Sequence, residues 1–186
     1  MSRTSLSKAL VVLALVLPSV ALMPAPFAPQ AVRAKEVHGA LTGDWRGTLR
    51  YRDYQDSSRF VSLPTLLTGT TTVDSASVRL AFTYDDGPGK TVRSTDQFAF
   101  DEAMRMLTWG PADGKRAPSA FSVESVRRDS ALTLVVETDG EDDNRPARLR
   151  ETITVGRGSL RVLKEVRFGT SAPWLYRHEY RFSRVR

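Results

Sequence analysis

The chain has 186 residues, no cysteine, and 27 lysines and arginines against 21 aspartates and glutamates, which gives a formal net charge of +6. The lack of cysteine excludes disulfides, thiolate metal sites and cysteine nucleophiles, so burial of apolar side chains has to hold the protein together. The basic excess is too small for a dedicated nucleic-acid-binding protein, and we expect no nucleic acid among its partners.

The first segment of the chain resembles a secretory signal. Two cations precede an unbroken apolar run over Ala9–Leu17, and small residues follow at two cleavage points, after Ala21 or after Ala34. The run is short for a membrane span, although an uncleaved anchor is the alternative. We therefore expect residues 1–34 to be a signal peptide and leader, and the mature protein to be secreted or periplasmic. Because the segment carries three cations and no acid, its removal lowers the net charge to about +3.

The rest of the chain predicts strands only, in one domain over residues 41–186. Apolar residues recur at every second position, and short runs rich in Gly, Pro, Asp and Asn separate the segments. His38 precedes the first strand and is assigned to the leader. We expect strands at Trp45–Asp53, Arg59–Gly69, Ala76–Tyr84, Thr91–Phe100, Met104–Trp109, Ser119–Arg127, Ala131–Thr138, Ala147–Val155, Leu160–Phe168 and Trp174–Arg184.

Ten consecutive strands joined by short turns form an up-and-down meander. A sheet of this size leaves two exposed edges unless it closes on itself. The sequence therefore predicts an all-β fold, a closed antiparallel up-and-down β-barrel of about ten strands. A two-sheet sandwich is the alternative, but it would need longer connections than the sequence contains.

The hairpin in "RLRETITVGRGSLRVLKEV" places two opposite charges on apolar faces. With Arg157 and Gly158 at the centre of a two-residue turn, Val155 faces Leu160. Counting outward in this register sets Glu151 opposite Lys164, at a distance that allows an ion pair.

The last strand carries Trp174, Tyr176, His178 and Tyr180 on one face, which we expect to be the inner one because exposed rings are costly. If Phe168 pairs with Trp174, the same counting sets His178 opposite Lys164. A slip by two residues would place Tyr176 or Tyr180 there instead.

The predicted interior row of Glu151, Lys164 and His178 has three interpretations. The first is a ligand site: a small, mostly hydrophobic molecule would bind inside a non-enzymatic barrel, with these groups as polar contacts and Trp174, Tyr176 and Tyr180 as walls. The second is a buried structural salt bridge with a neutral histidine beside it. The third is acid–base chemistry on an enclosed substrate.

The segment "LTGDWRG" opens the first strand, and a closed meander brings Trp45 near Arg184 on the last strand, where a cation–π contact is favourable. A Gly-x-Trp opening with a basic residue on the final strand resembles the calycin superfamily of lipocalin-like barrels. The sequence is more closely similar to nitrobindin-like ten-stranded barrels, through Gly43-Asp44-Trp45-Arg46-Gly47 and the ending "HEYRFSRVR". This resemblance implies haem, with His178 as the axial ligand and no other metal site. Our own expectation from the residues is that no cofactor is needed.

A further alternative uses the outside of the barrel. Arginines gather on the outer faces of the joined first and final strands, where they would contact an anionic lipid or polysaccharide of the cell envelope. The residues concerned are Arg46, Arg50, Arg52, Arg148, Arg150, Arg161, Arg177 and Arg181.

Overall fold

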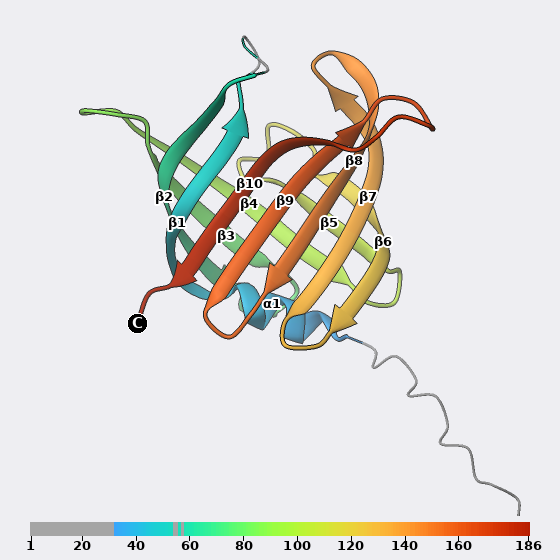
Figure 1. Cartoon of the computed structure of the whole chain (residues 1–186). Helices are drawn as coiled ribbons and strands as arrows, with labels where there is room; N and C mark the ends of the chain where they lie inside the picture. Colours follow the sequence, from blue (N-terminus) through green and yellow to red (C-terminus); the bar gives the residue numbers. More distant parts are fainter. Residues whose placement is uncertain (1–31, 54–55, 57) are drawn as a thin grey trace, which may run out of the picture.

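The computed structural model describes residues 32–53, 56 and 58–186, and its strands close into a barrel. The ten strands are β1 (Gly43–Arg52), β2 (Phe60–Thr71), β3 (Val78–Asp85), β4 (Thr91–Asp101), β5 (Met106–Pro111), β6 (Ser119–Arg128), β7 (Leu132–Asp142), β8 (Arg145–Val155), β9 (Ser159–Arg167) and β10 (Leu175–Arg184). Each pairs antiparallel with its neighbours in the sequence, and β1 pairs with β10 to close the ring (Figure 1). The predicted fold class is confirmed, and the sandwich is excluded.

Closure between β1 and β10 depends on residues of the opening motif. Trp45 pairs with Arg184, and the guanidinium carbon lies 4.1 Å from the centre of the indole ring, as predicted. A Cβ atom at Gly47 would lie 1.9 Å from the carbonyl oxygen of Arg181, so a side chain there would push the two strands apart. The glycine is therefore needed for the close approach that completes the barrel.

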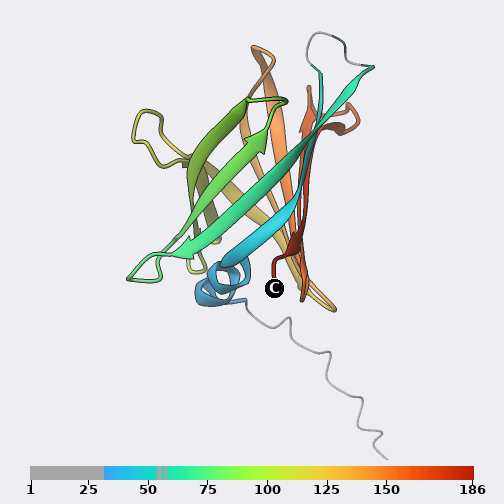
Figure 2. The ribbon, with the colours of Figure 1, turned by 90° about the vertical axis from the view of Figure 1, so that its left-hand side faces the viewer.

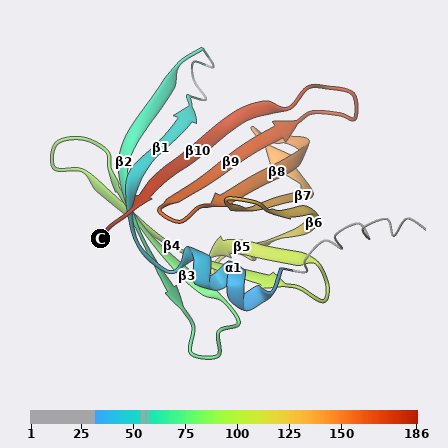
Figure 3. The same cartoon turned by 60° about the horizontal axis from the view of Figure 1, so that its bottom comes forward.

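A short helix, α1 (Ala34–Leu41), covers one end of the barrel, where the sequence analysis expected no helix (Figures 2 and 3). Val37 and Leu41 are spaced one turn apart, and their side chains are 1% and 2% exposed within the main core. Eight residues are too few to show a helical period in the sequence, and isolated helices of this length are unstable in water. Packing against the end of the barrel stabilises α1.

His38 lies on α1 and is buried, so its assignment to the leader is wrong. Its Nδ1 donates to the carbonyl oxygen of Ser75 at 2.9 Å, because its Nε2 accepts from the backbone N–H of Phe100 at 3.0 Å. These two bonds tie α1 to the β2–β3 turn and to β4. Residues 1–31 of the predicted signal peptide and leader, with the cleavage point after Ala21, lie outside the described residues, whereas the alternative point after Ala34 falls at the first residue of α1. No helix within the described part is long and apolar enough to span a bilayer.

The core fills the half of the barrel that α1 covers. Large apolar side chains from most strands meet there around Trp45, Phe98 and Leu134, all nearly inaccessible to solvent. The enclosed space left among them has a volume of about 10 Å³. This is room for about one water molecule, so this half cannot hold an organic ligand without repacking.

Candidate functional site

The predicted row of polar residues forms on three neighbouring strands. Glu151 on β8 pairs with Lys164 on β9, and Lys164 pairs with His178 on β10. Both pairings are those predicted, although nearer the β9–β10 turn Val166 pairs with Leu175 and not with Tyr176, as counting from Phe168 and Trp174 required. Because neighbours across a ladder share a face, the three side chains belong to the inner face that also carries Ile153 and Val162.

Glu151 is the most unusual member of the row. Its side chain is 8% exposed, and its Oε2 atom has no hydrogen-bond partner in the part of the chain that the structure describes. Burial raises the pKa of this carboxyl from 4.5 to about 8, although the positive charge of Lys164 acts in the opposite direction. The described residues contain no ion pair between Glu151 and Lys164. The expected salt bridge is therefore not formed, and near neutral pH Glu151 is mainly protonated.

His178 is held in its neutral form. Burial, together with the smaller effect of the charge on nearby Lys164, lowers the pKa of its imidazole from 6.5 to about 3. The ring packs edge-on against Tyr180, with 5.6 Å between the ring centres. At neutral pH the imidazole therefore has one N–H donor and one nitrogen acceptor available on the inside of the barrel.

A pair of tyrosines separates this row from the packed core. The hydroxyl groups of Tyr180 and Tyr84 lie 3.0 Å apart, which links β10 to β3 across the inside of the barrel. The ring of Tyr180 also packs against Phe82 and Phe182, at 5.3 and 5.7 Å between centres. Burial raises the pKa of both tyrosines, so their hydroxyls stay protonated. The pair forms a floor between the filled half and the other half.

The half beyond this floor is open to solvent. Val92 pairs with Tyr84 on the inner face, and yet it is 45% exposed. Other inward residues of this half are also partly exposed: Leu49, Tyr51, Val61, Leu63 and Ser94. Opposite the row, the indole nitrogen of Trp109 donates to Asp96 at 3.0 Å, and burial raises the pKa of that carboxyl. The open half therefore has an apolar wall with polar groups at two places.

The prediction that Trp174 and Tyr176 line the interior is wrong. The ring of Trp174 lies against the guanidinium groups of Arg150 and Arg167, at 3.7 and 4.6 Å from the ring centre. Arg150 alternates with the inward Glu151 along β8, so this stack is on the outside. Tyr176 is outside too, where its hydroxyl donates to the carbonyl oxygen of Arg50 at 3.0 Å.

A β-bulge explains the error. The register of β10 against β9 shifts between Tyr176 and His178, so that Arg177 is an extra residue in the ladder. Residues before the bulge are moved to the opposite face from the one that simple alternation predicts. Tyr180, which follows the bulge, lies inside as expected.

The bulge also creates a contact that the sequence analysis missed. Arg177, assigned to the outer arginine group, forms an ion pair with the buried Asp142 at the end of β7. Its guanidinium lies 5.8 Å from the ring centre of Phe168, which packs on a small apolar cluster with Leu149 and Val166. This pair lies beside the row, toward the open end. Neither residue had a sequence signal, because Asp142 stands in a run of acids typical of a solvated turn.

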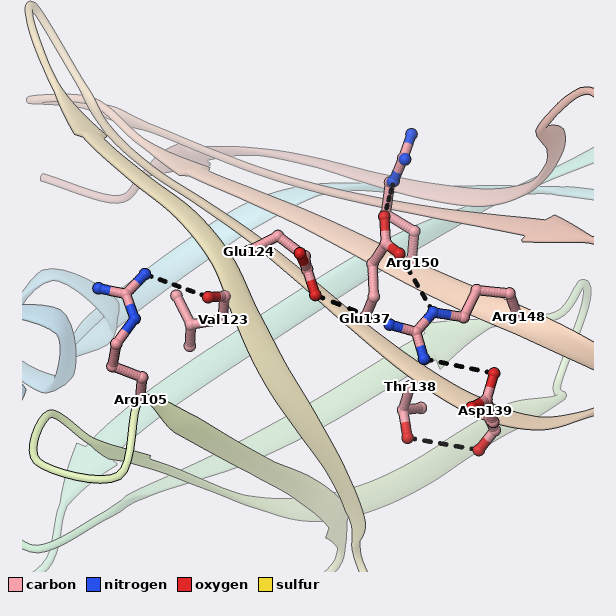
Figure 4. A network of polar contacts seen from close by, with 8 residues as sticks. All are labelled: Arg105, Val123, Glu124, Glu137, Thr138, Asp139, Arg148 and Arg150. Atoms are coloured by element: carbon pink, nitrogen blue, oxygen red, sulfur yellow. Dashed lines mark hydrogen bonds and ion pairs between the residues drawn. The ribbon is translucent and has the colours of Figure 1, made fainter. Parts of the chain in front are cut away.

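Several of the outer arginines are engaged with carboxylates. Arg148 and Arg150 both bind Glu137, at 3.1 and 2.8 Å, and Arg148 also reaches Asp139 at 3.3 Å (Figure 4). On β9 and β10, Arg161 and Arg181 share Glu179. Others lie on aromatic rings, as Arg50 does on Phe60 at 4.1 Å. Contact with an anionic envelope surface stays a prediction, and it would compete with these bonds.

The fold also occurs in a solved structure. The crystal structure of Rv2717c from M. tuberculosis matches with a TM-score of 0.56 at 12% identity, over 84% of this chain and 100% of that one. The likeness shows the barrel fold alone. A DUF3598-family protein of unknown function from Nostoc punctiforme aligns over 83% of this chain and 100% of its own, at 10% identity and a TM-score of 0.25. No family model and no curated protein matches the sequence.

Taken residue by residue, the structure brings together Glu151, Lys164, His178 and Tyr180 and separates them from Trp174 and Tyr176. Residues that sequence reasoning missed are Tyr84 and Asp96, which complete the inner surface from β3 and β4. Within the described residues, no cluster of three His, Asp or Glu side chains is placed to hold a metal ion.

Proposed function

We propose that the protein, after export, binds a small, mostly hydrophobic molecule in the open half of its barrel. Glu151, Lys164, His178 and Tyr180 would supply the polar contacts. The observation that supports this most is the buried Glu151 carboxyl with one unpaired oxygen. Buried polar atoms are nearly always hydrogen-bonded, so an unpaired carboxyl oxygen on the inner face of the barrel is well explained by a partner that comes and goes.

The half-exposed apolar residues of the open half support the same proposal. The apolar surface of Val92 and its neighbours is unfavourably exposed to water, and a bound apolar molecule would cover it. Binding without turnover is favoured over catalysis by the state of His178. A histidine whose pKa is about 3 is a weak proton acceptor at neutral pH, where a general base is most effective with a pKa near 7.

Native mass spectrometry of the protein purified from its source tests the proposal. We expect a bound small molecule in the wild type, and its loss or marked reduction in Lys164→Met. The matched control is Lys115→Met, because Lys115 is exposed in the β5–β6 turn, away from the interior. If the wild type never carries a small molecule and binds no member of a hydrophobic ligand library, the proposal is wrong.

Haem is a second candidate, because His178 offers a neutral imidazole on the inner face of the last strand, as the nitrobindin resemblance implies. Iron coordination requires this neutral form. The filled half leaves no room for a porphyrin, so the group would have to occupy the open half, with Tyr180 and the walls around Val61 beside it. Haem would supply redox or gas-binding chemistry there. A Soret band after addition of haemin, absent in His178→Ala, is expected for this candidate, and a wild type without the band rules it out.

A further inference from the structure

Lys164 is an inward-facing cation that forms no ion pair with any carboxylate of the described residues. Its neighbours across the ladders are Glu151, with which it forms no ion pair, and the neutral His178. Other inward-facing basic residues have partners. Arg177 is paired with Asp142, and Arg184 lies on Trp45 and donates to the backbone carbonyl of Thr42 at 2.8 Å. The ammonium group of Lys164 is therefore a positive charge with which a molecule in the open half could pair.

The groups beside Lys164 are suited to donate hydrogen bonds rather than to neutralise it. A protonated Glu151 has one O–H donor, and its Oε2 has no hydrogen-bond partner among the described residues. His178 has one N–H donor in its neutral form. A cationic ligand would be repelled by Lys164, and a neutral one would leave that charge uncompensated in a poorly solvated place.

We propose that the ligand of this site carries a single negative charge, a carboxylate, which binds Lys164 and accepts hydrogen bonds from Glu151 and His178 while a hydrophobic body fills the open half. This rests on the proposed function and specifies its ligand class. The carboxylate would provide the partner that both Lys164 and Glu151 lack. It would also be stabilised by an ammonium group and a carboxylic O–H at once, which makes both hydrogen bonds charge-assisted.

The proposal makes binding depend on pH through Glu151. An anionic ligand favours the protonated form, and with a pKa of about 8 that form falls from about nine-tenths at pH 7 to about one-tenth at pH 9. The groups that face Glu151 are Lys164 from β9, His178 and Tyr180 from β10, and the apolar Val136 from β7. Farther away, Arg177 and Asp142 are paired, and Asp96 on the opposite wall accepts from Trp109.

The experiment compares three ligands that differ only in the head group. Decanoate, decanol and decylamine displace the neutral fluorescent reporter N-phenyl-1-naphthylamine from the mature protein at pH 7 and pH 9. We expect decanoate to bind at least tenfold more tightly than the other two at pH 7, and to weaken about tenfold at pH 9. Decanoate itself is ionised at both values, so the change would report on the protein.

Two variants assign the effect to residues. Glu151→Gln keeps a hydrogen-bond donor and has no titrating proton, so decanoate should bind it with the same affinity at both pH values. Lys164→Met should lose the preference for decanoate, whereas Lys115→Met should behave as the wild type. Thermal unfolding of each variant verifies that it is folded.

The outcomes separate this inference from the proposed function. Equal affinities for the three ligands, or tightest binding of decylamine, overturn the carboxylate assignment and leave ligand binding in place. A pH dependence that persists in Glu151→Gln overturns the role of Glu151. If the reporter itself does not bind the wild type and none of the three ligands does, the proposed function fails with it.

Discussion

Replacing Glu151 by glutamine should stabilise the folded protein in a way that grows with pH. The folded carboxyl has a pKa of about 8, raised by burial from 4.5, so the folded state keeps a proton that the unfolded state releases. The contribution of Glu151 to stability is therefore fully present below pH 4.5 and is lost as the pH rises toward 8, by about 1.4 kcal/mol per pH unit. Glutamine does not titrate, so the variant lacks this loss.

The expected difference follows from the size of the shift. Relative to the wild type, Glu151→Gln should gain little at pH 4.5 and up to about 5 kcal/mol at pH 8, because the shift spans about 3.5 pH units. Urea unfolding of both proteins at pH 4.5, 6, 7 and 8 measures it. Taking the difference between them cancels the opposite contribution of His178. If the two stability curves run parallel from pH 4.5 to 8, Glu151 is not buried as an acid.

Three further predictions concern single features of the fold. The wild type should lose stability as the pH falls from 6.5 toward 3, since the folded imidazole, with its pKa of about 3, resists protonation, and His178→Phe should abolish this loss. If the urea midpoints of the variant and the wild type fall equally between pH 6.5 and 3, this prediction is wrong. His38→Phe should lower the free energy of unfolding by about 3 kcal/mol, because the Phe100 N–H and the carbonyl of Ser75 lose their hydrogen-bond partner. A urea midpoint equal to that of the wild type would show that these two bonds do not stabilise the protein. A chain that begins at residue 35 should be about 1 kcal/mol less stable than one that begins at residue 22, because it lacks the Arg33 carbonyl that accepts from the first turn of α1; equal melting temperatures would show that this turn contributes nothing.

Strand positions, closure and much of the register could be predicted because they depend on local rules. Alternation marks the inner face, and a two-residue turn such as that at Arg157 leaves one register for the hairpin around it. The pairing of Glu151 with Lys164 followed from that turn alone. The contact of Trp45 with Arg184 followed from closure of the ring, since a meander has only one way to join its ends.

The errors come from features that leave no periodic signal. The bulge at Arg177 depends on how the longer β9–β10 connection is accommodated, and a single extra residue reversed the faces of Trp174 and Tyr176. Helix α1 is stabilised by the barrel end that it covers rather than by its own sequence. The missing bond between Glu151 and Lys164 is a matter of side-chain reach and solvation, which register cannot specify.

The placement of α1 gives the barrel a direction. The helix, the start of the described chain and the C-terminus lie at the same pole, and the solvent-accessible inner residues lie toward the other (Figure 1). An affinity tag, a fluorescent protein or a surface linker attached at the C-terminus would therefore start from the pole that α1 covers. If the inner residues away from α1 bind a small molecule as proposed, immobilisation through this terminus would leave that end of the barrel facing the solution.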